Sequence, residues 1–275
     1  MLTKKLERMS SALQNAFDEG LVGAGLRESR SLWKRYRINE GYSGYANLLT
    51  LPENQKKLGK SDIFTVGLTL QHANVSGVET CAWRGHCTSV CVLDNGNGRY
   101  NTVQEARNTK TRFLSEHPED FVRILASEIK KHSDERDTVL VRMNVNSDIR
   151  WYSVLPDFAD GHDLLPNVMI YDYTKNPSVL GGDGKVGKRY RNIYSVHENS
   201  SIEKVREFVA RGGTAALVTD RKKNGPVMPL FMGLPMVDGD TSDDRYNESG
   251  VWVDLAAKGK ARTMPDVGFV RKIYS

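Results

Sequence analysis

The sequence predicts an α/β fold in which a mostly parallel sheet forms a partial (β/α) barrel, preceded by an N-terminal helical cap. From Asp62 onward, short apolar segments alternate with segments of helical periodicity. Several apolar segments show no alternation of polar and apolar residues, which is typical of strands covered on both faces. The length of 275 residues, of which 39% are hydrophobic and 27% charged, is sufficient for a large α/β domain with a buried core.

The first part of the chain is expected to be helical. Apolar residues recur there at helical spacing, namely Leu6, Met9, Leu13 and Phe17. A connection rich in glycine, tyrosine and asparagine follows from Gly41 to Asn47. We therefore expect residues 1–56 to form the helical cap and residues 57–275 to form the α/β domain. The basic run from Lys34 to Arg37 is interpreted as a solvated helix face rather than a phosphate contact.

The α/β domain is expected to contain strands separated by helices. Strands are predicted at residues 63–70, 138–146, 167–173, 192–196, 214–219, 234–237 and 251–256. A helix follows the turn-rich residues 94–98, with Thr102 and Glu105 spaced as a capping box. The next helix starts at Pro118 and carries an apolar stripe to about residue 131.

A later helix separates the strands predicted at 192–196 and 214–219. Ser200 and Glu203 have the spacing of a capping box, and the two glycines at 212–213 are suited to ending the helix. Strands that alternate with helices in this way favour parallel pairing through right-handed crossovers.

Each predicted strand ends in polar side chains. Because the carboxyl ends of parallel strands meet at one edge of the sheet, we expect a ligand site there. Four of these residues are predicted to line its pocket and take part in catalysis: Asp148, Asp172, Lys175 and Asp240. Three more are candidates for cofactor contacts: Asn146, Ser147 and Lys258. An ion pair between Asp172 and Lys175 is an alternative role for these two residues.

All three cysteines lie in one short segment, Cys81-Ala-Trp-Arg-Gly-His-Cys87-Thr-Ser-Val-Cys91. Thiolates this close together need a shared positive charge, so the segment is expected to bind metal through its cysteines. Three thiolates suit a four-iron cluster that keeps one iron open. Zinc is the alternative, but it prefers four ligands. His86 is adjacent to Cys87 and poorly placed to be the fourth, which would come from elsewhere, for example His72.

A group of carboxylates between residues 236 and 245 is a second candidate metal site. Asp238, Asp240 and Asp243 offer oxygen ligands of the kind that Mg²⁺ prefers. The segment lacks the downstream glutamate of a calcium loop, and Asp-Gly-Asp is also common in turns. A Mg²⁺-dependent nuclease with a structural cysteine or zinc site is therefore an alternative function.

The net charge and the hydropathy of the chain limit the classes of molecule that it can bind. A net charge of +5 and a pI of about 9.0 permit contact with nucleic acid without requiring it. A non-catalytic module that binds nucleic acid, or a host or phage protein, is a further alternative. No apolar run approaches the ~20 residues needed to cross a bilayer, and the N-terminus lacks a secretory signal. We expect no membrane partner and a cytoplasmic location, which also suits free thiols.

Several phrases of the sequence together resemble the mycobacteriophage gene-product-eighty-eight family. These phrases are the cysteine segment and residues 103–110, 146–151, 171–175 and 237–243. The resemblance covers most of the chain from about Lys57 to Val270. It implies a phage or prophage origin, and therefore the cytoplasm of the host cell.

This family is in turn similar, at a distance, to radical S-adenosylmethionine enzymes, in which a three-cysteine loop follows the first strand of a partial barrel. That resemblance implies S-adenosylmethionine as a further cofactor. The spacing here departs from the C-x3-C-x2-C of that superfamily, and residues 146–148 stand where its Gly-Gly-Glu segment would be. The leading prediction is a phage-type protein that binds a [4Fe-4S] cluster, with radical-type enzymatic use of its open iron as an additional hypothesis.

Overall fold

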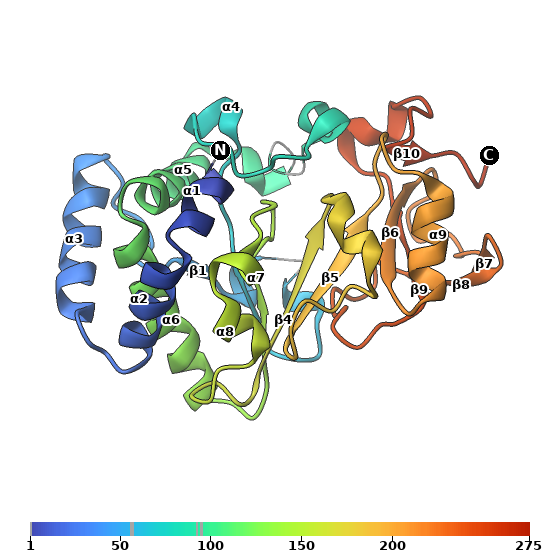
Figure 1. Ribbon diagram of the computed structural model, residues 1–275. Helices are drawn as coiled ribbons and strands as arrows, with labels where there is room; N and C mark the ends of the chain where they lie inside the picture. The colour runs from blue at the N-terminus through green and yellow to red at the C-terminus, as the bar shows by residue number, and fades with distance from the viewer. Residues whose placement is uncertain (1, 56–57, 92, 94–95) are drawn as a thin grey trace.

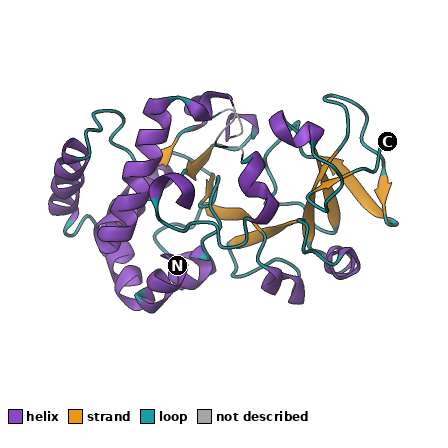
Figure 2. Ribbon diagram, turned by 90° about the horizontal axis from the view of Figure 1, so that it is seen from above, coloured by secondary structure: helices purple, strands orange, loops and turns teal. Residues whose placement is uncertain are grey.

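The computed structural model describes residues 2–55, 58–91, 93 and 96–275, and its N-terminal part is helical as predicted. The helices here are α1 (Leu2–Arg8), α2 (Ser10–Leu21) and α3 (Leu26–Asn39). Both α2 and α3 pack against α6 (Pro118–Asp134), and the N-terminal helices gather at one end of the molecule (Figures 1 and 2). A short strand, β1 (Leu49–Thr50), then pairs with the edge of the sheet.

The described residues form one open, mostly parallel sheet. Its 10 strands follow the order β1-β2-β3-β4-β5-β6-β9-β8-β7, with β10 paired to β6. The strands after β1 are β2 (Thr65–Leu68), β3 (Val139–Arg142), β4 (Val168–Thr174), β5 (Tyr190–Ser195), β6 (Thr214–Thr219), β7 (Leu230–Phe231), β8 (Leu234–Asp238), β9 (Val251–Ala256) and β10 (Val270–Arg271). Only the β1/β2 and β7/β8 pairs are antiparallel in this described sheet. The carboxyl ends of β2 to β6, β8 and β9 therefore share one edge.

Strand positions agree well with the sequence, and the largest difference is at β3. The strands predicted at 214–219 and 251–256 have the predicted limits. β3 ends at Arg142, four residues before the predicted limit. The chain leaves the sheet there because the Asn144 side chain donates to the Ile149 carbonyl oxygen at 2.8 Å and accepts from the Ile149 N–H at 3.0 Å. These bonds close a loop over the strand end.

The remaining α-helices include α4 (Ala73–Ser76), α5 (Asn101–Glu116), α7 (Trp151–Val154), α8 (Pro156–Asp160) and α9 (Ile202–Ala210). Short 3-10 helices lie at η1 (Pro52–Asn54), η2 (Leu58–Lys60), η3 (Gly85–Val90), η5 (Gly96–Arg99), η6 (Pro177–Gly181) and η7 (Gly259–Thr263). None of the described helices combines the length and the apolar character needed to span a membrane.

Two predicted helix starts are wrong. The capping box of Thr102 and Glu105 does not form, because α5 already begins at Asn101 and its cap, Tyr100, makes no side-chain capping bond. The cap of α9 is Ser201, whose hydroxyl accepts from the Lys204 N–H, rather than Ser200. Ser200 Oγ instead accepts from the His197 N–H at 3.0 Å.

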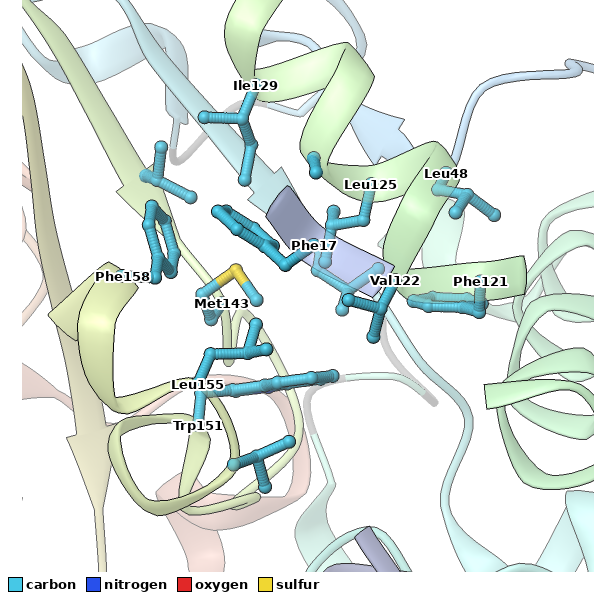
Figure 3. Packing of buried hydrophobic residues seen from close by; sticks show 14 of the residues in the cluster. Phe17, Leu48, Phe121, Val122, Leu125, Ile129, Met143, Trp151, Leu155 and Phe158 are labelled. Atoms are coloured by element: carbon cyan, nitrogen blue, oxygen red, sulfur yellow. The ribbon is translucent and has the colours of Figure 1, made fainter. Parts of the chain in front are cut away.

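The largest hydrophobic cluster joins the N-terminal helices to the sheet. Phe17 of α2 packs on Phe158 of α8, with ring centroids 4.8 Å apart. Figure 3 shows these rings beside Leu125, Met143 and Trp151, which lie in α6, after β3 and in α7. This shared core fixes the loop after β3, which contributes to the site described next.

Candidate functional site

The cysteine segment lies over the carboxyl edge of the sheet, between β2 and α5. It is tied to the loop after β3, since the Asp148 N–H donates to the Thr80 carbonyl oxygen at 2.8 Å. The Cys81 thiol donates to the Asn146 carbonyl oxygen at 3.4 Å, while the Asn146 side chain accepts from the Leu70 N–H at 2.9 Å. The predicted cofactor residue Asn146 therefore touches the cysteine segment.

The far side of the cysteine segment is held by Glu198, a residue beyond β5. Its carboxylate accepts from the His86 N–H at 2.7 Å. Gly85 leaves room for this contact, because a Cβ there would come within 1.8 Å of Glu198 Oε1. Cys87 also packs against the apolar cluster that includes Phe269. The segment thus bridges the ends of β3 and β5.

Lys175 is the cation that faces the cysteines. It follows the end of β4 and is partly buried. Burial alone would lower the pKa of its ammonium, but the charges of Cys87, Asp148, Cys81 and Cys91 outweigh burial and raise the pKa. Lys175 therefore lies close enough to the cysteine segment for charge on deprotonated thiols to favour its ammonium form.

The Cys81 thiol is protonated at neutral pH. Burial raises its pKa to about 12, with a further increase from Asp148, and Lys175 only partly opposes these effects. A metal ion that binds this sulphur must displace the proton, so binding is expected to be pH dependent.

Asp148 positions Lys175 and the cysteine segment. Its carboxylate accepts from the Thr174 hydroxyl at 2.6 Å and from the Lys175 N–H at 3.0 Å. Burial raises the pKa of this carboxyl despite these bonds. Both oxygens are engaged by the end of β4, so the role that this geometry supports is to hold Lys175 in place. Ser147, predicted to contact a cofactor, is buried and donates to Asn144 Oδ1 at 2.8 Å.

Asp172 lies below this edge and is fully buried. It accepts from the Asn144 N–H at 2.6 Å, from the Asn144 amide at 3.0 Å and from the Tyr190 hydroxyl. Burial raises the pKa of the Asp172 carboxyl to about 7. The structure thus separates Asp172 from Lys175, which lies among the cysteines.

The carboxylates of the second candidate metal site are engaged by cations. Arg221 Nη2 lies 2.9 Å from Asp238 Oδ1 and 3.0 Å from Asp240 Oδ2, and Arg221 Nε lies 2.8 Å from Asp254 Oδ2. Lys258 lies 2.5 Å from Asp240 Oδ1. The predicted catalytic residue Asp240 and the predicted cofactor residue Lys258 therefore pair with each other. We call these five residues the arginine network.

Asp243 belongs to a separate buried group on one face of the sheet. Its carboxylate accepts from the Arg142 guanidinium at 2.5 Å and from the Tyr171 hydroxyl at 3.2 Å. Arg142 lies over the Tyr173 ring, 4.6 Å from its centroid. Arg142 and Arg221 were not identified from the sequence. Arg221 could have been found from its position directly after an aspartate at the end of a strand.

Across residues 2–55, 58–91, 93 and 96–275, no group of three or more His, Cys, Asp or Glu side chains is arranged to hold a metal ion. The described cysteines are free thiols rather than a disulfide. As a donor set they fit a thiophilic metal or a cluster, but their sulphurs must converge further to bind it.

Comparison with known proteins gives one match. The family model described as Gene product 88 matches residues 40–272, a range that contains the cysteines and every other candidate residue above. No curated protein and no solved structure matches the chain.

Proposed function

We propose that this chain, which belongs to the Gene product 88 family, binds an iron-sulphur cluster through Cys81, Cys87 and Cys91. The observation that carries the proposal is that three free thiols lie in one segment, which hydrogen bonds to Asn146, Asp148 and Glu198 hold over the carboxyl edge of the sheet. A [4Fe-4S]²⁺ core with three thiolates has a net charge of about −1, which a nearby cation offsets. Lys175, whose ammonium responds to charge on the cysteine segment and on Asp148, is the candidate cation.

The protein's own residues would have to release and reorient the thiols. The Cys81 thiol would give up its proton and its bond to the Asn146 carbonyl oxygen. Asp148 and Glu198 would keep the neighbouring backbone in place through their bonds to the Lys175 and His86 N–H groups. A bound cluster with one open iron would supply a Lewis acid or an electron donor at this edge.

The radical-enzyme form of this function extends the same proposal. In it, the open sheet acts as a partial barrel and S-adenosylmethionine is the ligand of the open iron. Asn146, Ser147 and Lys175 are the residues expected to orient that ligand, because they follow the ends of β3 and β4 and the Asn146 carbonyl oxygen accepts from the Cys81 thiol.

The geometry favours the cluster over a magnesium-dependent nuclease. The three carboxylates expected to bind Mg²⁺ are each paired with an arginine or lysine group, which neutralises the charge that would attract a metal ion. Zinc remains the competing metal for the cysteines, since it also takes thiolate ligands.

Metal analysis of anaerobically purified and reconstituted protein tests the proposal. We expect a brown protein with about four irons and four sulphides per chain. Cys81→Ser, Cys87→Ser and Cys91→Ser should each lose most of the iron, whereas Ser89→Ala in the same loop should keep it. A colourless protein with one tightly bound zinc would contradict the proposal, as would full iron content in the three cysteine variants.

A further inference from the structure

One tryptophan lies exposed beside the cysteines. Of the four tryptophans in the chain, Trp33, Trp151 and Trp252 are buried, whereas Trp83 in the cysteine segment is 45% exposed. Tyr100, directly before α5, is 59% exposed. Both aromatic side chains belong to the connection from β2 to α5, which runs over the carboxyl edge of the sheet.

Basic side chains flank the same connection. η3 and η7 are in contact, and Figure 1 shows them side by side above β6. Ala261 of η7 faces inward, while its neighbours Lys260 and Arg262 are exposed. Arg99, next to Tyr100, is also exposed.

Three of these basic groups have no acidic partner in the part of the chain that the structure describes. Within the described part of the chain, no ion pair within 4.0 Å involves Arg99, Lys260 or Arg262. Lys258, only two residues before Lys260, is by contrast paired with Asp240. Although Arg262 Nε donates to the Ala257 carbonyl oxygen at 3.3 Å, the three cations have no carboxylate partner among the described residues and are therefore available to an external anion.

We propose that Trp83, Arg99, Tyr100, Lys260 and Arg262 form a surface, here called the basic rim, that binds single-stranded nucleic acid. Exposed aromatic rings stack on unpaired bases, and neighbouring lysine and arginine side chains contact the phosphates. An acidic protein partner would use the charges but would leave the exposed rings without a specific role. Duplex DNA would not use them either, because its bases already stack on one another.

The basic rim is independent of the proposed cluster, since none of its members is a cysteine. It borders the cysteine segment, so a strand bound there would lie against the edge that carries Lys175. If both proposals hold, the substrate class at this edge is a nucleotide within a single strand.

Tryptophan fluorescence gives a direct test with the full chain. Titration with oligo-dT or oligo-rU should quench the emission of the exposed Trp83, while the three buried tryptophans stay unaffected. In anisotropy measurements with a labelled oligonucleotide, Trp83→Ala should weaken binding about 10-fold, the size expected for one lost stacking contact. Trp83→Phe should retain most of the affinity but lose most of the quenching. The comparison of dT with rU shows which sugar the surface prefers.

Salt dependence tests the phosphate contacts. The double variant Lys260→Ala/Arg262→Ala should lower the slope of log affinity against log salt by about 1.4, since each single-strand phosphate contact contributes about 0.7. The matched control is Lys34→Ala/Arg35→Ala, which removes the same charge from the exposed face of α3. Its slope should stay within experimental error of that of the unmodified protein.

Three results would overturn this proposal. The first is an equal loss of affinity in the rim and α3 variants. The second is equal affinity for duplex and single strand. The third is competition by polyglutamate as strong as that by oligonucleotide and insensitive to Trp83→Ala, which would indicate an acidic protein partner. The iron-free Cys81→Ser protein should still bind the oligonucleotide, which separates this outcome from that of the cluster proposal.

Discussion

The cysteine segment and the arginine network occupy the same edge of the sheet but differ in how their charges are balanced. In the network, three carboxylates share the Arg221 guanidinium, and Asp240 also meets Lys258. Around the cysteine segment, one ammonium faces three thiols, of which Cys81 is held protonated. In the arginine network each carboxylate has a cation partner within the protein. Around the cysteine segment, the Lys175 ammonium can still offset the negative charge of a bound group. Polar strand ends alone therefore do not distinguish a structural network from a ligand site.

Removal of Arg221 should have the largest effect on stability. Arg221→Ala would leave Asp254, which is fully buried, without its cation, and the loss of one partner of a buried pair costs about 3–5 kcal/mol. Urea denaturation measures this change, with Lys222→Ala at the next, exposed position as control. A loss no greater than that of the control would show that the network does not hold this part of the sheet together.

The pH dependence of stability tests the protonation of Asp172, which lies beneath the cysteine segment. Its pKa is raised from 3.8 to about 7, so the folded chain binds this proton more tightly than the unfolded chain. Its contribution to the free energy of unfolding is therefore largest below about pH 4 and falls as the pH rises towards 7.

Relative to Asp172→Asn, the unmodified protein should lose roughly 3 kcal/mol of stability between about pH 4.5 and pH 7. Denaturant unfolding of both proteins at a series of pH values measures this difference. Parallel stability profiles for the two proteins would mean that Asp172 is ionised throughout, and that its amide and phenol donors suffice without a proton.

The variant Lys175→Met tests whether the Lys175 ammonium stabilises the fold or a bound ligand. Replacement of this partly buried charge by an apolar side chain of similar length should change the stability of the metal-free protein by no more than about 1 kcal/mol. Reconstituted protein should nevertheless lose iron to a chelator at least about 10-fold faster, because the compensating charge is gone. Lys175→Arg, which keeps the charge, is the control. Unchanged iron retention in Lys175→Met would show that the Lys175 ammonium does not offset the charge of a group bound to the cysteines.

Lys258 should contribute least, although it belongs to the arginine network. Its side chain is 57% exposed, and an exposed ion pair contributes about 0.5 kcal/mol. Thermal or urea unfolding of Lys258→Ala should thus be close to that of the unmodified protein, and the small difference should shrink at high salt. A loss of several kcal/mol in the free energy of unfolding would show that Lys258 contributes to stability on the same scale as Arg221.

Strand positions could be predicted from the sequence because they depend on local apolar runs. The strand at 214–219 begins and ends in threonine, and the strand at 251–256 is a mostly apolar run that starts directly after Gly250, so local composition marks both. Helix starts were less predictable, since Ser200 and Ser201 are equally good caps and a local bond from the His197 N–H engages the Ser200 hydroxyl instead.

Charge pairing could not be predicted, because it joins residues far apart in the chain. Asp243 contacts Arg142 across 101 positions, and Asp240 contacts Lys258 only after an intervening strand. The position of Lys175 near the cysteines also depends on strand order, which places the end of β4 beside the segment that follows β2. The sequence placed these side chains at the carboxyl ends of the strands, but it could not assign each carboxylate to its cation.

The strand order β6-β9-β8-β7 has a consequence for folding kinetics. Strands β2 to β6 are added in the order in which they leave the ribosome, so each finds its neighbour already made. The β7/β8 hairpin precedes β9 in the chain but is joined to the rest of the sheet through β9. It must therefore wait for β9 to emerge and pair with β6. Docking of this hairpin is expected to be a late folding step, and its strands remain open to mispairing until then.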